Sequence, residues 1–328
     1  MFIPVMVFLL LLQTVQAQKN FSELDTLMSL RKGQFGNNMG VMIWKDTIIH
    51  QRFTGDFTLN TQMPIGCASA WLTAALSMTF VDEGKISLDD PISKYLPIYA
   101  TYAKKYLTIR HCLANVTGLA AEKGGIQRFF QKNKFETLED EVNSYASSRA
   151  IVNNPGEAFN YNNMGTNIVG RVLEIVGKKS FDRLMMERIF RPCAMKKSSF
   201  TSEGAINPFS GAVSTPADYL KFLAMLMNKG MAGVKKVLSE ASIAEMQKVQ
   251  TGTAKIIFVP KDLEGYSYCL GHWLKPADMN ITSPGLSGGW EYIDLQKKYA
   301  CVIFAIPKKQ DDKKKIYQEF IDAVSRQF

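Results

Sequence analysis

The sequence has few of the residues that build metal and redox centres. Its 328 residues include three histidines and five cysteines, and neither type recurs at a spacing such as HExxH or CxxC. We therefore expect no metal site and no other cofactor. An exported compartment permits disulfides, but the cysteines are odd in number and widely separated, so the sequence does not specify which of them pair. Four of them lie in apolar surroundings typical of small core residues: Cys112, Cys193, Cys269 and Cys301.

The sequence also lacks the features of a nucleic-acid-binding protein. Lysine and arginine exceed aspartate and glutamate by 39 to 30, giving a net charge of +9. However, no basic stripe carries interleaved aromatic residues, so a nucleic-acid partner is not expected. Hydrophobic residues at 46% and charged residues at 21% are instead typical of a globular domain with a substantial core.

The N-terminus holds an apolar run at residues 3–12, which is too short to span a bilayer comfortably. No lysine or arginine precedes it, but Val15 and Ala17 are small residues at the positions that a signal peptidase reads. We interpret residues 1–17 as an export signal cleaved before Gln18; an uncleaved N-terminal anchor is the alternative. The expected product is secreted or periplasmic, without stable membrane insertion after cleavage.

The remaining chain, residues 18–328, shows no internal repeat or low-complexity linker and is expected to form one domain. Alternating residues predict a hairpin over 41–53. Helical periodicity fills the middle of the chain, and strand patterns return after about residue 266, before a final helix. The expected arrangement has a sheet lobe and an inserted helical lobe. The sheet lobe covers about 18–66 and 231–328, and the helical lobe covers 67–230.

One stretch, "IGCASAWLTAALSMTFVDEGKISLDDPISKYLP" at residues 65–97, has the pattern of an active-site helix. Hydrolases with a Ser-x-x-Lys motif place a nucleophilic serine at the start of such a helix and a lysine three residues later. Here those positions hold Cys67 and Ala70. A register starting at Ser69 would place Leu72 at the lysine position, so we do not expect Ser69 to be the nucleophile.

Four more blocks follow in order: "LTIRHCLANVTGL", "NPGEAFNYNNMGTNIVGRVLEIV", "GAVSTPADYLKFLAMLMNKGM" and "SPGLSGGWEYIDLQKKYACVIF". With the first stretch, they resemble the motifs of the β-lactamase-related serine hydrolases, which include class C β-lactamases, penicillin-binding carboxypeptidases and esterases. The resemblance covers essentially the whole chain after the signal. It implies an α/β fold of the β-lactamase/transpeptidase type, in which helices flank an antiparallel sheet and a helical lobe is inserted.

The resemblance also implies roles for particular residues. It puts Cys67 at the nucleophile position and Ala70 at the position of the lost lysine. Tyr161 matches the tyrosine that shares in proton transfer, although a core tyrosine is the alternative. Asn163 would bind a substrate amide or orient that tyrosine; otherwise it would cap a helix.

The last block supplies the third motif of the family. It places Ser283 and Gly285 beside the nucleophile, and it makes the N–H of Leu286 the second donor to an oxyanion. A plain glycine turn is the alternative interpretation of this segment.

The sequence supports two candidate functions that belong to different classes. An alanine at position 70 cannot accept a proton, which favours a degenerate hydrolase that binds a peptide, cell-wall or acyl ligand in the cleft with little turnover. The alternative is an active acyl hydrolase, because a thiol at a helix N-terminus can form a thiolate without the lysine. It would use Cys67 with Tyr161. A purely structural exported protein would instead have a filled cleft.

Overall fold

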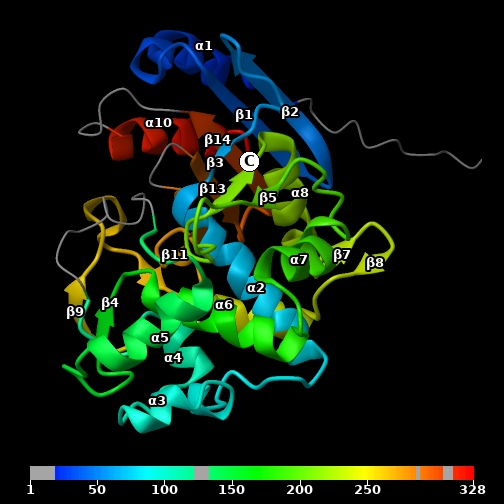
Figure 1. The fold of residues 1–328 in the computed structure, drawn as a ribbon. Helices are drawn as coiled ribbons and strands as arrows, with labels where there is room; N and C mark the ends of the chain where they lie inside the picture. The colour runs from blue at the N-terminus through cyan, green and yellow to red at the C-terminus, as the bar shows by residue number, and fades with distance from the viewer. Residues whose placement is uncertain (1–18, 122–132, 286–288, 306–312) are drawn as a thin grey trace, which may run out of the picture.

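A computed structural model describes residues 19–121, 133–285, 289–305 and 313–328 (Figure 1). Its largest feature is a seven-stranded antiparallel sheet in the order β10-β11-β12-β13-β14-β1-β2. The predicted fold class is confirmed, because the first hairpin and the last strands share this sheet. The strands are β1 (Met39–Lys45), β2 (Thr47–Thr54), β10 (Ser267–Tyr268), β11 (Trp273–Lys275), β12 (Asn280–Thr282), β13 (Gly289–Asp294) and β14 (Tyr299–Ala305).

Each face of the sheet builds its own core, because successive strand residues point to opposite faces. On the outer face, α1 (Ser22–Arg31) and α10 (Lys313–Ser325) pack over residues such as Val41 and Ile303. On the inner face, α8 (Pro216–Met227) packs against β14 and β1. In Figure 1 the outer helices lie at the top, and the helical part of the chain lies below the sheet.

The inner core is centred on α2 (Ser69–Asp82). Every residue from 69 to 80 is buried, as the mostly apolar sequence of this helix predicts. Helices α6 (Met164–Gly177), α7 (Phe181–Met185) and α9 (Glu240–Gln247) pack around it. The remaining helices are α3 (Ile98–Thr101), α4 (Ile109–Leu113) and α5 (Leu138–Ser148).

Three small sheets complete the fold. β3 (Met63–Pro64), β6 (Ala212–Ser214) and β5 (Ser199–Phe200) form one of them. β4 (Ala158–Asn160) pairs in parallel with β9 (Lys255–Phe258), and β7 (Met231–Ala232) pairs with β8 (Lys235–Lys236).

The alternating and apolar pattern at residues 266–274 predicts one strand, and this prediction is wrong in one respect. The segment forms two short antiparallel strands, β10 and β11, joined by a turn. Gly271 in this turn has φ +75°, and a Cβ there would lie 2.4 Å from the carbonyl oxygen of Ala70. The turn therefore packs directly against α2, which an uninterrupted strand could not do.

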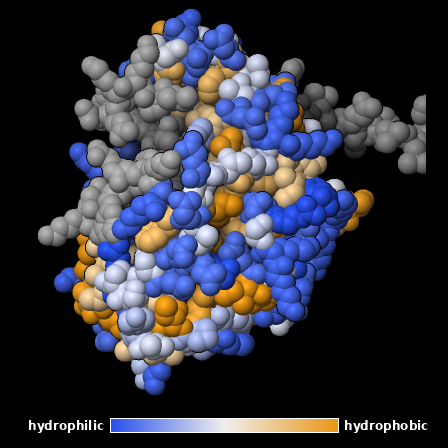
Figure 2. All heavy atoms as spheres, in the orientation of Figure 1, coloured by the Kyte–Doolittle hydropathy of each residue, from blue (hydrophilic) through white to orange (hydrophobic). Residues whose placement is uncertain are grey.

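The surface mixes polar and apolar side chains. Figure 2 shows a largely hydrophilic face, with hydrophobic side chains gathered at the lower left, where β9 lies in Figure 1. In β9, Ile256 and Ile257 are 55% and 47% exposed. Within the described part of the chain, no helix combines the length and apolar character needed to cross a bilayer.

Candidate active site

Cys67 lies in a short 3-10 helix, Gly66–Ala68, immediately before α2. Its main-chain N–H donates to the carbonyl oxygen of Gly285 at 3.3 Å. Its carbonyl oxygen accepts a hydrogen bond from the Ser283 hydroxyl, also at 3.3 Å. Two residues of the predicted third motif are therefore bonded to the backbone of the residue at the nucleophile position.

The other residues of this turn are also hydrogen-bonded, mostly to distant parts of the chain. The Tyr219 hydroxyl, from α8, donates to the carbonyl oxygen of Ala68 at 3.0 Å. The buried Ser69 hydroxyl donates to the carbonyl oxygen of Gly66 at 2.6 Å and accepts from the N–H of Ala212 at 3.0 Å. Ser69 thus connects the turn to β6. We call residues 66–69 the Cys67 turn.

Ala70 follows inside α2 and is fully buried. Trp71 stacks on His272 with ring centroids 4.9 Å apart. Burial lowers the pKa of His272 to about 4, so this imidazole is neutral at pH 7. The helix start is therefore packed against an uncharged aromatic group.

Tyr161 directly follows β4 and is 2% exposed. Its N–H donates to the carbonyl oxygen of Phe258 in β9 at 3.1 Å, which fixes its backbone. Its hydroxyl forms a hydrogen bond with the Cys67 side chain. Burial is the main cause that raises the pKa of Tyr161 well above its usual value, and the nearby Cys67 and Tyr268 raise it further. Tyr161 therefore keeps its proton at neutral pH.

Aromatic rings surround Tyr161. Its ring centroid lies 5.0 Å from Trp273, 5.2 Å from Phe209 and 5.6 Å from Tyr268. Phe159 packs against Trp273 at 5.7 Å with the rings nearly perpendicular. We call these five residues the aromatic wall. Sequence reasoning did not single out Tyr268 or Trp273, because their alternating pattern indicated only a strand.

Asn163 does not join this group. Its side-chain amide donates to the Tyr145 hydroxyl of α5 at 3.5 Å. Asn163 occupies the N-cap position of α6, as the alternative interpretation expected, but its side chain makes no cap hydrogen bond there. The Asn162 side chain has that role instead, accepting from the N–H of Met164 at 2.9 Å.

The third motif lies close to the Cys67 turn. A Cβ at Gly285 would lie 2.5 Å from the carbonyl oxygen of Ile65, so only glycine allows the two backbones to approach this closely. Gly285 also donates its own N–H to the carbonyl oxygen of Gly289 at 3.0 Å. Leu286, the predicted second oxyanion donor, lies outside the described residues.

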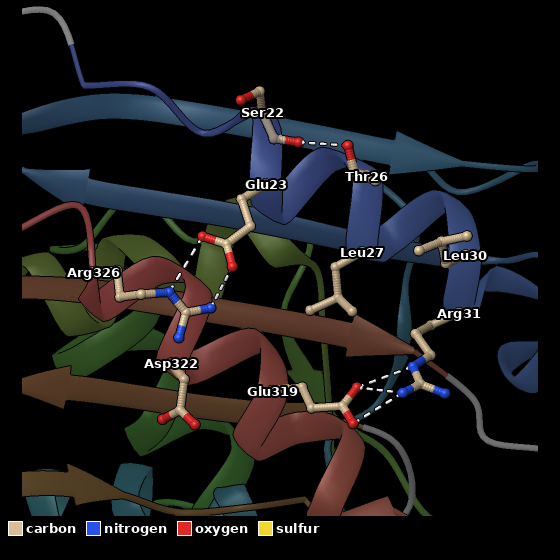
Figure 3. A pocket seen from close by; sticks show the side chains of 9 residues that line it. All are labelled: Ser22, Glu23, Thr26, Leu27, Leu30, Arg31, Glu319, Asp322 and Arg326. Carbon is tan, nitrogen blue, oxygen red and sulfur yellow. Dashed lines mark hydrogen bonds and ion pairs between the residues drawn. The ribbon is translucent and has the colours of Figure 1, made fainter.

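A groove lies on the other face of the sheet, between α1 and α10 (Figure 3). It has a volume of about 590 Å³, and Arg31–Glu319 and Arg326–Glu23 ion pairs join its two helices. The sheet separates it from Cys67. No cluster of His, Cys, Asp or Glu suited to a metal ion occurs among the residues that the structure describes.

Comparison with known proteins identifies the family. Among solved structures, a Bacteroides dorei protein assigned provisionally to the β-lactamases is 24% identical, with a TM-score of 0.82 over 94% of this chain and 98% of that one. EstCE1, a hydrolase with promiscuous acyltransferase activity, is 15% identical, with a TM-score of 0.76 over 93% and 98%. At 24% and 15% identity, this structural similarity establishes only the fold of the chain.

Two curated relatives give the same result. The uncharacterized protein MT1414 of Mycobacterium tuberculosis is 23% identical over 54% of this chain and 56% of its own length. The D-alanyl-D-alanine-carboxypeptidase/endopeptidase AmpH of Escherichia coli is 23% identical over 50% of this chain and 49% of its own. The chain thus spans about half the length of the curated relatives it matches. The family description "Beta-lactamase" matches residues 37–320, and the chain belongs to this hydrolase-like family.

Proposed function

We propose that this protein binds a peptide or acyl ligand beside Cys67 and Tyr161 and turns it over slowly or not at all. The observation that carries the proposal is the hydrogen bond from the Cys67 N–H to the Gly285 carbonyl. In acyl transfer, the N–H of the nucleophile stabilises the developing oxyanion. A carbonyl oxygen on that N–H occupies the donor and presents a partial negative charge where an oxyanion would form.

The second support is the chemistry at position 70. We interpret Cys67-x-x-Ala70 as a Ser-x-x-Lys motif that has lost its amine. An alanine can neither accept nor donate a proton, and Tyr161 is held in its neutral form by burial. Deprotonation of the Cys67 thiol therefore lacks both partners that the family mechanism would supply.

The relatives support the ligand class. AmpH is named for carboxypeptidase and endopeptidase activity, and EstCE1 is described as a hydrolase with acyltransferase activity. Both activities involve an acyl carbon bonded to nitrogen or oxygen. We propose that the ligand of this chain has such an acyl group and that the aromatic wall contacts it.

Hydrolysis of two activated acyl compounds tests the proposed loss of turnover. The protein is incubated with a β-lactam and with 4-nitrophenyl acetate, and hydrolysis is compared with that of Cys67→Ala. We expect the two rates to be equal within error. Hydrolysis that disappears in Cys67→Ala would contradict the proposal and favour the Cys67 hydrolase.

We also propose that the chain is exported after cleavage between Ala17 and Gln18. The support is the apolar run at 3–12 and the small residues before the proposed cleavage point. Expression of the full chain in a secretion-competent host, followed by N-terminal sequencing of the exported product, tests this. A product that begins at Gln18 would support cleavage, and a membrane-retained product that keeps residues 1–17 would contradict it.

A further inference from the structure

Three lysine ammonium groups gather near Phe328, which follows α10. Lys19 precedes α1, Lys45 ends β1, and Lys297 lies in the turn between β13 and β14. The Nζ atom of Lys19 lies 3.9 Å from the centre of the Phe328 ring, and that of Lys45 lies 4.9 Å from it. Tyr299 stacks on one face of this ring, with the centroids 4.2 Å apart. The two ammoniums therefore share the part of the ring that Tyr299 leaves open.

Within the described part of the chain, the three ammoniums donate hydrogen bonds only to uncharged oxygen atoms. Lys19 donates to the carbonyl oxygen of Gln327 at 2.6 Å, and Lys45 donates to that of Lys297 at 3.0 Å. Lys297 donates to the carbonyl and hydroxyl oxygens of Ser325, both at 2.7 Å. No carboxylate of the described residues, in a side chain or at the end of the chain, forms an ion pair with any of them. Their positive charges are therefore not neutralised by an ion pair.

The end of α10 accounts for part of this cluster. The last carbonyl groups of a helix carry about half a negative charge and favour a nearby cation. The bonds of Lys19 and Lys297 to Gln327 and Ser325 have this role. Lys45 bonds to a carbonyl of a turn instead, and three positive charges exceed half a negative one. Capping of α10 therefore does not explain the whole cluster.

The three ammoniums are close enough to repel one another. Burial is the main cause that lowers the pKa of Lys19, and the positive charges of Lys45 and Lys297 lower it further. All three residues are half-buried, so solvent reaches them. Each ammonium has three N–H donors, and the bonds above leave at least one of them on each lysine. An anion at this cluster would accept these donors and reduce the repulsion.

The charge and the directions of the donors favour a phosphate group over a carboxylate. A phosphate monoester carries a charge of about −1.5 to −2 at pH 7 and has three acceptor oxygens, and lysine binds it as a point charge. A carboxylate has one charge and two oxygens. The three lysines come from separate segments of the chain, so they approach an anion from different directions.

We propose that Lys19, Lys45 and Lys297 form a binding site for a doubly charged phosphate group, either free phosphate or a phosphomonoester lipid headgroup. Phe328 and Tyr299 pack with the outer core, whereas Cys67 belongs to the inner core. The site is thus separate from the candidate active site, and the inference does not depend on the proposed function.

Inorganic phosphate tests the site by isothermal titration calorimetry of the whole protein, with sodium chloride holding the ionic strength constant. Lys45→Gln removes one ammonium and keeps an amide that can donate to the Lys297 carbonyl. We expect it to weaken phosphate binding about tenfold, the equivalent of one hydrogen bond to a charged group. Lys235→Gln is the matched control, because it removes the same charge at an exposed position of β8. It should leave phosphate affinity unchanged, and acetate should bind wild type more weakly than phosphate does.

Vesicles distinguish the two sources of phosphate. Sedimentation with phosphatidylcholine vesicles is compared with and without phosphatidic acid. Binding that needs phosphatidic acid and is lost in Lys45→Gln but not in Lys235→Gln assigns a lipid headgroup. Phosphate binding without vesicle binding assigns free phosphate, and either result supports the site.

Two results would overturn the site. One is equal phosphate affinity of wild type and Lys45→Gln, and the other is acetate binding as tight as phosphate binding. The melting temperature in chloride separates the site from a purely structural role. We expect Lys45→Gln to melt at the wild-type temperature or higher, because repulsion on Lys19 is reduced. A lower melting temperature with unchanged phosphate affinity would show that the lysines only stabilise the end of α10.

Discussion

The Cys67 turn and the aromatic wall lie side by side but differ in how their polar groups are used. In the turn, the N–H and the carbonyl of Cys67, the carbonyl of Ala68 and the hydroxyl of Ser69 are bonded to other parts of the chain. In the aromatic wall, Tyr161, Tyr268 and Trp273 are instead held by ring contacts, with centroids 4.7–5.6 Å apart.

This difference separates two functions that a working hydrolase combines. Oxyanion stabilisation needs donors that are held in place and available, and the Cys67 N–H is no longer available. Ligand recognition needs a surface that contacts the ligand, and we propose that the aromatic wall provides it. On the proposed function, the family fold keeps a recognition surface at the wall while the neighbouring turn no longer supports turnover.

The largest expected loss of stability comes from placing a lysine amine at position 70. In Ala70→Lys, the new ammonium would enter a fully buried position beside the uncharged turn at Gly271. A buried charge without a partner costs about 3–5 kcal/mol. Urea denaturation should show a loss of this size, whereas Ser147→Lys, at an exposed position of α5, should change stability little. An unchanged stability of Ala70→Lys would show that position 70 opens onto solvent or a cation partner.

Ser69→Ala tests whether the turn is a structural connection. The substitution removes a hydroxyl that bonds two buried backbone groups, Gly66 and Ala212, and should cost about 3 kcal/mol. Ser77→Ala is the control in the same helix, since the Ser77 hydroxyl bonds only the carbonyl of Thr73 one turn earlier. Equal losses for the two variants would contradict the structural role of Ser69.

Gly285→Ala tests the contact between the third motif and the turn. The added methyl group would meet the carbonyl oxygen of Ile65 at 2.5 Å, so one backbone must move. We expect a loss of about 2 kcal/mol. At Gly33, where an added Cβ meets nothing within 4 Å, the same substitution should be nearly neutral. A neutral Gly285→Ala would mean that the two backbones are not in contact.

The smallest expected change in stability concerns an ion pair that lies away from both the Cys67 turn and the aromatic wall. A hydrogen bond from Arg188 is the main cause that lowers the pKa of Glu83 to about 2, against about 4.3 in an unfolded chain. The resulting stability is present above pH 4.3 and is lost as the pH falls towards 2. Because the Glu83 side chain is 43% exposed, we expect less than about 1 kcal/mol. Glu83→Gln should lower the melting temperature slightly at pH 7 and by less at pH 3; an equal difference at both would contradict this origin.

The fold could be predicted largely from the sequence because its signals are local. Apolar periodicity indicated α2. A threonine followed by a proline is also typical of a helix start, and at the start of α8 the Thr215 hydroxyl accepts from the N–H of Asp218. The break between β10 and β11 was missed because it depends on packing of Gly271 against α2, a contact between distant residues.

The site could be predicted in part. The motifs brought Cys67, Tyr161, Ser283 and Gly285 together correctly as neighbours, but their catalytic and binding roles stay predictions. The bond that occupies the Cys67 N–H depends on the orientation of one peptide carbonyl at Gly285, which no residue pattern specifies. Tyr268 and Trp273 were missed as neighbours of Tyr161 because their ring contacts join distant parts of the chain.

The most direct test of the account is the intact mass of the protein during exposure to 4-nitrophenyl acetate. Wild type and Cys67→Ala are followed over the same times, and any adduct is located by peptide mapping. We expect no acetyl group on Cys67 within the time in which an active acyl hydrolase would complete many turnovers. Rapid acetylation of Cys67 followed by return to the starting mass would show a working nucleophile and contradict the account.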